Sequence, residues 1–167
     1  YQKDPFFLYY AINRPHYPLQ PDEKWRKHYA NLESPRKEYA AFITTIDERI
    51  GQLLDKLDTL GIRENTVVIF QSDHGYSTEE RTFGGGGSAG PFRGAKFSLF
   101  EGGIRVPAII SWKGHLPENE SRNQMALNID WFPTIADLCG IEVPKTIEGK
   151  SLLPIIKSKK SPSAHSS

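Results

Sequence analysis

The sequence predicts an α/β fold in which a mainly parallel sheet is flanked by helices. Three observations lead to this prediction: an apolar run over residues 6–12, a long amphipathic pattern over 35–60, and a β-branched apolar run over 66–70. A strand, a helix and a strand in this order form a βαβ unit, which joins parallel strands through a right-handed crossover. A further apolar run at 106–112 adds another strand.

The first two predicted strands share a pattern. FFLYYAI at 6–12 and TVVIF at 66–70 are short and almost continuously apolar, which is typical of strands buried on both faces. Pro15, Pro18 and Pro21 follow the first run and exclude regular structure there. The second run leads directly into the polar residues QSDHG. Both runs therefore predict buried strands that end in polar loops.

The long helix has a start signal, a periodic face and a stop signal. Ser34 offers a capping hydroxyl, and Pro35 suits the first helical position. Apolar side chains then recur at steps of three and four residues, and Gly61 is a natural end. A shorter helix is predicted over 128–140, with Asp130 as the candidate cap.

A glycine-rich connection spans residues 75–103, and a connection of this length in a compact domain is usually functional or disordered. A phosphate-binding loop does not fit, because an alanine precedes Lys96 and a phenylalanine follows it. We therefore expect the glycines at 84–87 to form a mobile lid or a spacer. No apolar periodicity surrounds Glu79 and Glu80, so we expect both side chains to be solvated.

The composition excludes several classes of protein. The net charge is +1 and the pI is near 8.0, which gives no electrostatic basis for binding nucleic acid or an anionic membrane. No apolar run approaches the roughly 20 residues of a membrane helix. Cys139 is the only cysteine, which excludes an internal disulfide and a thiolate-rich metal site. The chain opens without Met, and we expect it to be a piece of a larger protein.

Polar residues that suit catalysis follow two of the predicted strands. In an open parallel sheet, ligands bind beyond the carboxyl ends of the strands, where His16 and the pair Asp73 and His74 lie. Aspartate and histidine are metal-ligand types, and Gly75 permits a sharp turn beside them. Lys96 precedes FEGGIR, where a cation can meet an anionic substrate. On this pattern alone, ordinary loop histidines and a capping aspartate remain the simpler interpretation, and a solvated lysine fits equally well.

Five segments together resemble the sulfatase family of the alkaline-phosphatase superfamily. They are PFFLYYAINRPHYPLQ, ENTVVIFQSDHGY, RGAKFSLFEGGIRVPAIISWKG, NIDWFPTIADLCGI and IEGKSLLPII, and they cover most of residues 5–156 in the family's order. The pattern K-x-x-x-x-E-G-G-x-R-V-P after S-D-H-G is the most specific part. The resemblance implies that residues 1–156 are a partial, alkaline-phosphatase-like sulfatase catalytic domain. We expect residues 157–167 to be a polar, disordered tail.

The resemblance also implies a role for each candidate residue. Asp73 and His74 resemble one pair of ligands to a divalent cation, usually calcium. Lys96 resembles the lysine that grips the sulfate group, and His16 the histidine that contacts the sulfate and its leaving-group oxygen. His16 and Lys96 are therefore the expected catalytic and substrate-binding residues. The segment EGGIR resembles the structural turn behind the site, where Arg105 has a supporting role.

Two parts of the family pattern are not found in the sequence. Family members use a formylglycine nucleophile, made from Cys or Ser in a Cys/Ser-x-Pro/Ala-x-Arg motif. Cys139 lies in LCGIEVP instead, and we expect a buried thiol at a helix end. The aspartate pair that completes the metal site is absent too. We therefore predict a fragment of a sulfuric ester hydrolase, inactive in isolation, with the formylglycine expected in the missing N-terminal part.

Two other interpretations stay open. One is a phosphodiesterase or phosphonate hydrolase of the same superfamily, since S-D-H-G also occurs there, although EGGIRVP with Lys96 favours a sulfatase. The other is a non-catalytic, truncated remnant. The expected partner is a sulfated small molecule or glycan, with no nucleic acid and no membrane span, and the oligomeric state is open. The resemblance suggests an exported protein: periplasmic, extracellular or lysosomal.

Overall fold

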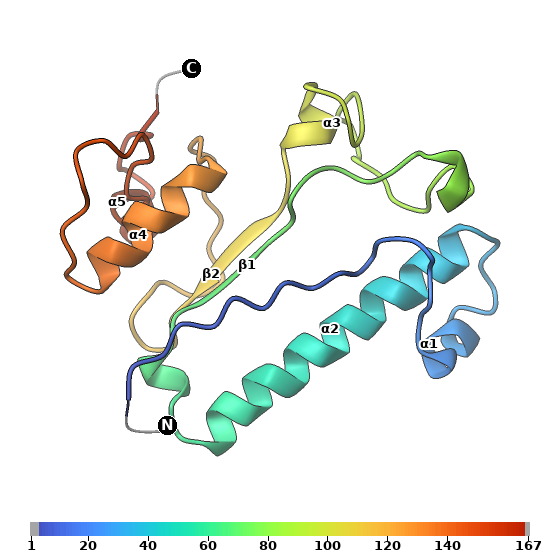
Figure 1. Cartoon of the computed structure of the whole chain (residues 1–167), viewed down its shortest axis with the longest axis horizontal. Helices are drawn as coiled ribbons and strands as arrows, with labels where there is room; N and C mark the ends of the chain where they lie inside the picture. The colour runs from blue at the N-terminus through green and yellow to red at the C-terminus, as the bar shows by residue number, and fades with distance from the viewer. Residues whose placement is uncertain (1–3, 166–167) are drawn as a thin grey trace. The chain divides into compact units, whose positions relative to one another are not determined.

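The structure of the chain is a computed structural model, and it describes residues 4–165 (Figure 1). The chain divides into two compact units; the first ends at Ile110 and the second begins at Ser111. None of the helices in residues 4–165 has both the length and the apolar character that a membrane crossing requires.

The long helix that the sequence predicts is α2, Arg36–Thr59, in the first unit. Gly61 follows its last turn with φ +67°, a left-handed conformation that favours glycine, and its N–H bonds to the carbonyl of Asp58. The start differs from the prediction: Pro35 is the N-cap residue and forms no side-chain capping bond, so the hydroxyl of Ser34 does not cap the helix.

The apolar stripe of α2 is only partly buried, because Ile43 is exposed and Ile50, Leu53 and Leu54 are half-buried. Its buried residues are Ala41, Phe42, Thr45, Ile46 and Leu57. A short helix that the sequence analysis missed, α1 at Glu23–His28, packs against α2. The indole Nε1 of Trp25 donates to Glu48 on α2 at 3.0 Å, which fixes α1 to the longer helix.

Two short strands, β1 at Val68–Gln71 and β2 at Ala108–Ser111, form a two-stranded sheet within the described residues. They match the predicted runs at 66–70 and 106–112. The parallel arrangement is not confirmed, because these two strands run antiparallel: the N–H of Ser72 bonds to the carbonyl of Pro107. Only short helical turns lie between β1 and β2 in this chain.

The segment at 6–12 is extended in Figure 1, but the strand predicted there is absent from the described structure. Tyr9 is 82% exposed on one face of the segment and Leu8 is 59% exposed on the other, so neither face is buried. Within residues 4–165, α2 contacts α1 and the 3₁₀ turn η1 at Arg63–Asn65, and it packs against neither strand. A strand needs a hydrogen-bonded neighbour, which a local apolar pattern does not specify.

The glycine-rich connection contains two helical turns, η2 at Glu80–Thr82 and α3 at Glu101–Ile104. Gly86, in the stretch expected to be a lid or spacer, is buried. Its carbonyl accepts a hydrogen bond from the guanidinium of Arg36, and a Cβ at this position would lie 2.5 Å from the Cβ of Tyr39. The stretch is therefore packed against the start of α2.

The second unit is organised around Asp130. A 3₁₀ turn, η3 at Asn128–Asp130, leads into α4 at Trp131–Leu138, which confirms the helix predicted over 128–140; α5 spans Leu153–Lys157. The buried Asp130 carboxylate accepts hydrogen bonds from the backbone N–H groups of Leu127 and Lys150 and lies 2.8 Å from Nε2 of His165. Asp130 is the N-cap residue of α4, as predicted, but its carboxylate forms no capping bond to that helix and joins chain segments instead.

Residues 158–165, which the sequence predicts to be part of a disordered tail, contact the rest of the second unit. Besides His165, the side chain of Gln124 donates to the carbonyls of Lys159 and Ser161 at 3.0 and 2.9 Å. Residues 166–167 lie outside the described residues. Cys139 caps the C-terminal end of α4 as expected but is exposed, so the expectation of a buried thiol is wrong.

Candidate active site

Asp73 and His74 lie in the loop directly after β1. Oδ2 of Asp73 is 3.0 Å from Nε2 of His74, and Nδ1 of His74 contacts the carbonyl of Gly75 at 2.8 Å. Nδ1 thus faces a carbonyl oxygen, and Nε2 faces the carboxylate. The Asp73 side chain is 81% exposed. One oxygen and one nitrogen are therefore presented together to solvent.

This donor pair fits part of a divalent-cation site. Carboxylate oxygens and imidazole nitrogens both bind divalent cations. Calcium takes about six to eight oxygen ligands, which is more than this pair provides. In the part of the chain that the structure describes, no group of three or more His, Cys, Asp and Glu side chains is arranged to hold a metal ion. Asp73 and His74 can therefore hold a cation only together with ligands from other residues.

Backbone contacts hold the loop after β1 against the EGG turn. The N–H of Gly75 donates to the carbonyl of Gly103 at 2.9 Å, and the N–H of Gly102 donates to the carbonyl of Arg93 at 2.7 Å. A Cβ at Gly75 would lie 2.0 Å from the carbonyl oxygen of Gly102. A Cβ at Gly102 would lie 2.2 Å from that of Gly94. Glycine is thus required wherever these backbones meet.

Lys96 is fixed to the loop after β1. Its N–H donates to the carbonyl of Tyr76 at 2.9 Å, which ties it to the loop after β1. Its Nζ lies 3.4 Å from Oε2 of Glu79 and 4.9 Å from the centroid of the Phe97 ring. The Lys96 side chain is only 13% exposed. A solvated lysine is therefore not what the structure contains: the side chain is largely enclosed, and its ammonium group is paired with a carboxylate.

Glu79 differs from the expectation of a solvated side chain, which is wrong for this residue. Its side chain is 19% exposed and accepts hydrogen bonds from Arg81, Ser77 and Lys96. The hydrogen bond from Arg81 holds the pKa of Glu79 below its usual value; burial opposes this, and Ser77 and Lys96 add to the lowering. Glu80 is exposed, as expected.

Contacts of Arg81 connect the Glu79 cluster to the loop that contains His16. The guanidinium of Arg81 lies 4.1 Å from the centroid of the Tyr17 ring, and the ring of His16 packs on Tyr17 with centroids 4.2 Å apart. His16 itself is exposed, with Nδ1 2.9 Å from the carbonyl of Tyr17. Its imidazole therefore lies on a ring that Arg81 also contacts.

The structure thus joins Lys96 to the His16 loop, whereas Asp73 and His74 contact each other. Within residues 4–165, no hydrogen bond or ion pair links Asp73 or His74 to Lys96 or His16. Sequence reasoning missed the connecting residues, which are Tyr17, Glu79 and Arg81. The run E-E-R before the glycines is a weak signal for a charge cluster. Nothing local in the sequence points from Arg81 to a tyrosine 64 positions earlier.

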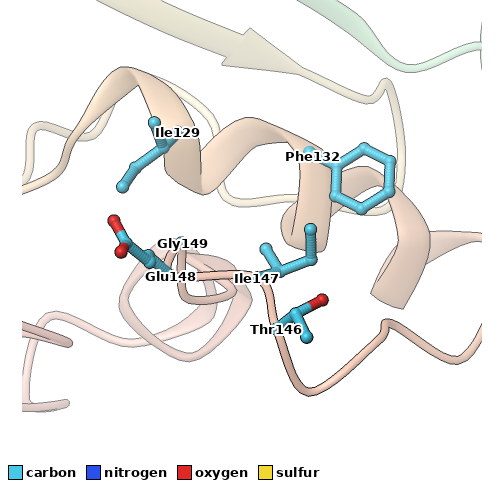
Figure 2. A pocket seen from close by; sticks show the side chains of 6 residues that line it. All are labelled: Ile129, Phe132, Thr146, Ile147, Glu148 and Gly149. Atoms are coloured by element: carbon cyan, nitrogen blue, oxygen red, sulfur yellow. The ribbon is translucent and has the colours of Figure 1, made fainter.

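A separate pocket lies in the second unit, between the start of α4 and the loop before α5, and has a volume of about 340 Å³ (Figure 2). It is lined by Ile129, Phe132, Thr146, Ile147, Glu148 and Gly149. Of these six residues, only Glu148 is charged, and a carboxylate repels an anionic ester. This pocket contains none of the predicted site residues.

A comparison with protein families identifies the family to which this chain belongs. The family model described as Sulfatase matches residues 1–141. The chain belongs to the sulfatase family. Rat (Rattus norvegicus) steryl-sulfatase is 39% identical over 138 residues, covering 77% of this chain and 24% of the relative. Mouse (Mus musculus) N-acetylgalactosamine-6-sulfatase is 37% identical over 155 residues, covering 92% of this chain and 29% of the relative. The chain thus spans less than a third of each curated relative.

Solved structures agree with the family. The crystal structure of Ps i-CgsB in complex with k-i-k-neocarrahexaose superimposes with a TM-score of 0.84 at 32% identity, covering 92% of this chain and 34% of that one. A phosphonate monoester hydrolase from Silicibacter pomeroyi has a TM-score of 0.62 at 23% identity, covering 83% of this chain and 26% of that one, and shows the fold alone. The sulfatase fold that the sequence resemblance implies is therefore confirmed.

Proposed function

We propose that this chain supplies one part of the active site of an enzyme that hydrolyses sulfate esters. The observation that carries the proposal is the enclosed ammonium group of Lys96, fixed beside the EGG turn in a chain that belongs to the sulfatase family. We call a protein that contains this chain together with a sulfatase nucleophile and the remaining metal ligands the whole enzyme.

Each candidate residue has a role in this proposal. Lys96 binds the sulfate oxygens, because an ammonium group in a partly enclosed site is a fixed positive partner for their charge. His16 contacts the sulfate and gives a proton to the departing alcohol oxygen, which gains negative charge as the ester bond breaks. Asp73 and His74 would hold a divalent cation, calcium in this proposal. The cation would supply further charge stabilisation, and the formylglycine would supply the nucleophile.

The substrate is a sulfated small molecule or glycan. The names of the relatives point to chemically different substrates, a steroid and an amino sugar, and Ps i-CgsB was solved with a carrageenan oligosaccharide. These names have in common a sulfate group or a sulfated carbohydrate. We therefore propose the substrate only as a member of that broad class. An exported location, periplasmic, extracellular or lysosomal, belongs to the same proposal and rests on the family alone.

A phosphonate or phosphodiester hydrolase is the second candidate, because a phosphonate monoester hydrolase shares the fold. The test is the ratio of kcat/KM for an aryl sulfate to that for an aryl phosphonate monoester, measured with the whole enzyme. We expect the sulfate to be the better substrate by at least about tenfold. A higher kcat/KM for the phosphonate than for the sulfate would replace our proposal with the second candidate. If the whole enzyme hydrolyses neither compound, the remaining interpretation is a non-catalytic, truncated remnant.

A further inference from the structure

Glu79 divides its two carboxylate oxygens between two cations. Oε1 accepts hydrogen bonds from Arg81, with Nε at 2.8 Å and Nη2 also bonded. Oε2 accepts a hydrogen bond from Oγ of Ser77 at 3.1 Å and faces Nζ of Lys96 at 3.4 Å. A carboxylate that bridges two cations in this way fixes the position of each relative to the other.

The Lys96 end of this bridge is loose enough to admit a substrate. At 3.4 Å, the contact between Nζ of Lys96 and Oε2 of Glu79 is near the upper limit of a hydrogen bond. An ammonium group also has three N–H donors. Only 13% of the Lys96 side chain is exposed, and Glu79 supplies a counter-charge to its ammonium group. Glu79 therefore holds Lys96 in place and leaves N–H groups for another anion.

The Arg81 end of the bridge leads to His16. The guanidinium of Arg81 is held by Glu79 and lies 4.1 Å from the centroid of the Tyr17 ring. His16 packs on the same ring, from a proline-rich loop more than 60 positions earlier in the chain. A cation over an aromatic face is attracted to it, and the attraction is directional. Glu79 thus acts on both candidate sulfate contacts, directly on Lys96 and through Arg81 and Tyr17 on His16.

We infer that Glu79 is a positioning residue that sets the distance between Lys96 and His16 around the sulfate group. The inference rests on the proposed function, since it assigns Lys96 and His16 to the sulfate. The charges of the cluster agree with a singly charged ligand: Lys96 and Arg81 carry two positive charges and Glu79 one negative charge. The net charge of +1 matches a sulfate monoester, which carries one negative charge.

The charge balance predicts separate effects on binding and on turnover. Glu79→Gln removes the negative charge, so the cluster attracts anions more strongly, and the inhibition constant of inorganic sulfate should fall. Lys96 and His16 lose their fixed relative position, so kcat should fall by about tenfold to a hundredfold, because misplacement of about 1 Å can cost a factor of roughly 10². Glu80→Gln is the matched control, since it makes the same chemical change at an exposed neighbour.

The experiment measures kcat and KM for an aryl sulfate, the inhibition constant of inorganic sulfate, and the melting temperature of each variant of the whole enzyme. We expect Glu79→Gln to lower kcat and to tighten sulfate inhibition, with Glu80→Gln unchanged. Unchanged kcat and inhibition in Glu79→Gln would overturn the inference. A lower kcat with a lower melting temperature and unchanged inhibition would also overturn it, because that pattern indicates a purely structural role.

Two further variants separate this inference from the proposed function. If Lys96→Ala keeps full activity, the proposed role of Lys96 in binding the sulfate fails, and with it the part of the site that this chain is proposed to supply. If Lys96→Ala is inactive while Glu79→Gln behaves as wild type, only the positioning role fails. Arg81→Gln covers the case in which Glu79→Gln does not fold, since the Arg81 side chain is more than half exposed. It should lower kcat by about tenfold, with the Lys96 pair intact, and an unchanged kcat would overturn the link to His16.

Discussion

The carboxylates in the loop after β1 have different surroundings. Asp73 is exposed beside the His74 ring, Glu79 is enclosed between cations, and Glu80 is exposed. Glu79 is therefore unsuitable as a neutral comparison for Asp73, because its removal also disturbs Lys96. Glu80 is the appropriate comparison.

Asp73→Ala in the whole enzyme should lower kcat/KM by about 10²–10³, because loss of electrostatic stabilisation at a reacting centre typically costs that much. Glu80→Ala should leave activity unchanged and alter the free energy of unfolding by no more than about 0.5 kcal/mol. Excess calcium should partly restore Asp73→Asn, which keeps an oxygen ligand, but not Lys96→Ala. The measurement is kcat/KM across a calcium titration, with folding checked by thermal melts. Equal activity in folded Asp73→Ala and Glu80→Ala would remove Asp73 from the metal site.

Asp130 should make the stability of the chain depend on pH. Burial raises the pKa of Asp130, but hydrogen bonds from the backbone of Lys150 and Leu127 and from His165 outweigh it, so the pKa lies below its usual value. The carboxylate therefore stabilises the fold fully above its unfolded pKa of about 4, and this contribution is lost as the pH falls through the lower folded value.

The test compares Asp130→Asn with the wild-type chain by urea unfolding between pH 7 and pH 2.5. At pH 7 the variant should be less stable by about 1.5–3 kcal/mol, the usual contribution of a hydrogen bond to a charged group. The difference should shrink below about pH 4. Glu142→Gln, at an exposed residue of the same unit, should show no such change. A difference that stays constant over the whole pH range would contradict the assigned ionisation of Asp130.

Residue types and strand ends drew attention to His16, Asp73, His74 and Lys96, and the family resemblance gave them roles, but neither pointed to their neighbours. The charge of a lysine and the ligand chemistry of an aspartate are visible in a sequence. The bridge from Lys96 to His16 is not visible, because it depends on the distance in space between two loops. For this reason Glu79 was expected to be solvated.

At the scale of elements, local signals located the helices and strands better than they located partners. The long helix, the helix at α4 and the two strands were predicted within a few residues, since their periodicity and end signals are local. The direction of the strands and the state of residues 6–12 depend on pairing with distant segments. The short helices α1 and α5 were missed because six and five residues give little periodic signal.

The EGG turn should not tolerate a side chain at Gly102. A Cβ there would lie 2.2 Å from the carbonyl oxygen of Gly94, so Gly102→Ala forces two backbone segments apart and should cost about 1–3 kcal/mol or more of the free energy of unfolding. Gly51→Ala is the control, because Gly51 lies inside α2 and nothing lies within 4 Å of its Cβ position. That change should stabilise the chain by about 0.5–1 kcal/mol. Equal effects in chemical denaturation would show that the turn is not packed as described.

At the scale of the whole molecule, the chain belongs to the sulfatase family and is proposed to supply one part of its active site. It spans 24% and 29% of the steryl-sulfatase and N-acetylgalactosamine-6-sulfatase relatives. The described residues include the two proposed metal donors and the proposed sulfate contacts. The motif Cys/Ser-x-Pro/Ala-x-Arg does not occur among the 167 residues.

The purified 167-residue chain should therefore have no sulfatase activity, because it has no sulfatase nucleophile motif. The measurement is release of phenol from an aryl sulfate with calcium present, and the Lys96→Ala chain serves as the background. Turnover by the unmodified chain well above that background would mean that another residue of this chain is a nucleophile.

The measurement that tests the central claim most directly is kcat/KM of Lys96→Ala in the whole enzyme with an aryl sulfate. Lys56→Ala is the matched control, because Lys56 is an exposed lysine on α2. If the enclosed ammonium group of Lys96 binds the sulfate, its loss should lower kcat/KM by about 10²–10³ without lowering the melting temperature, while Lys56→Ala stays at the wild-type value. Wild-type kcat/KM in a folded Lys96→Ala enzyme would contradict the account.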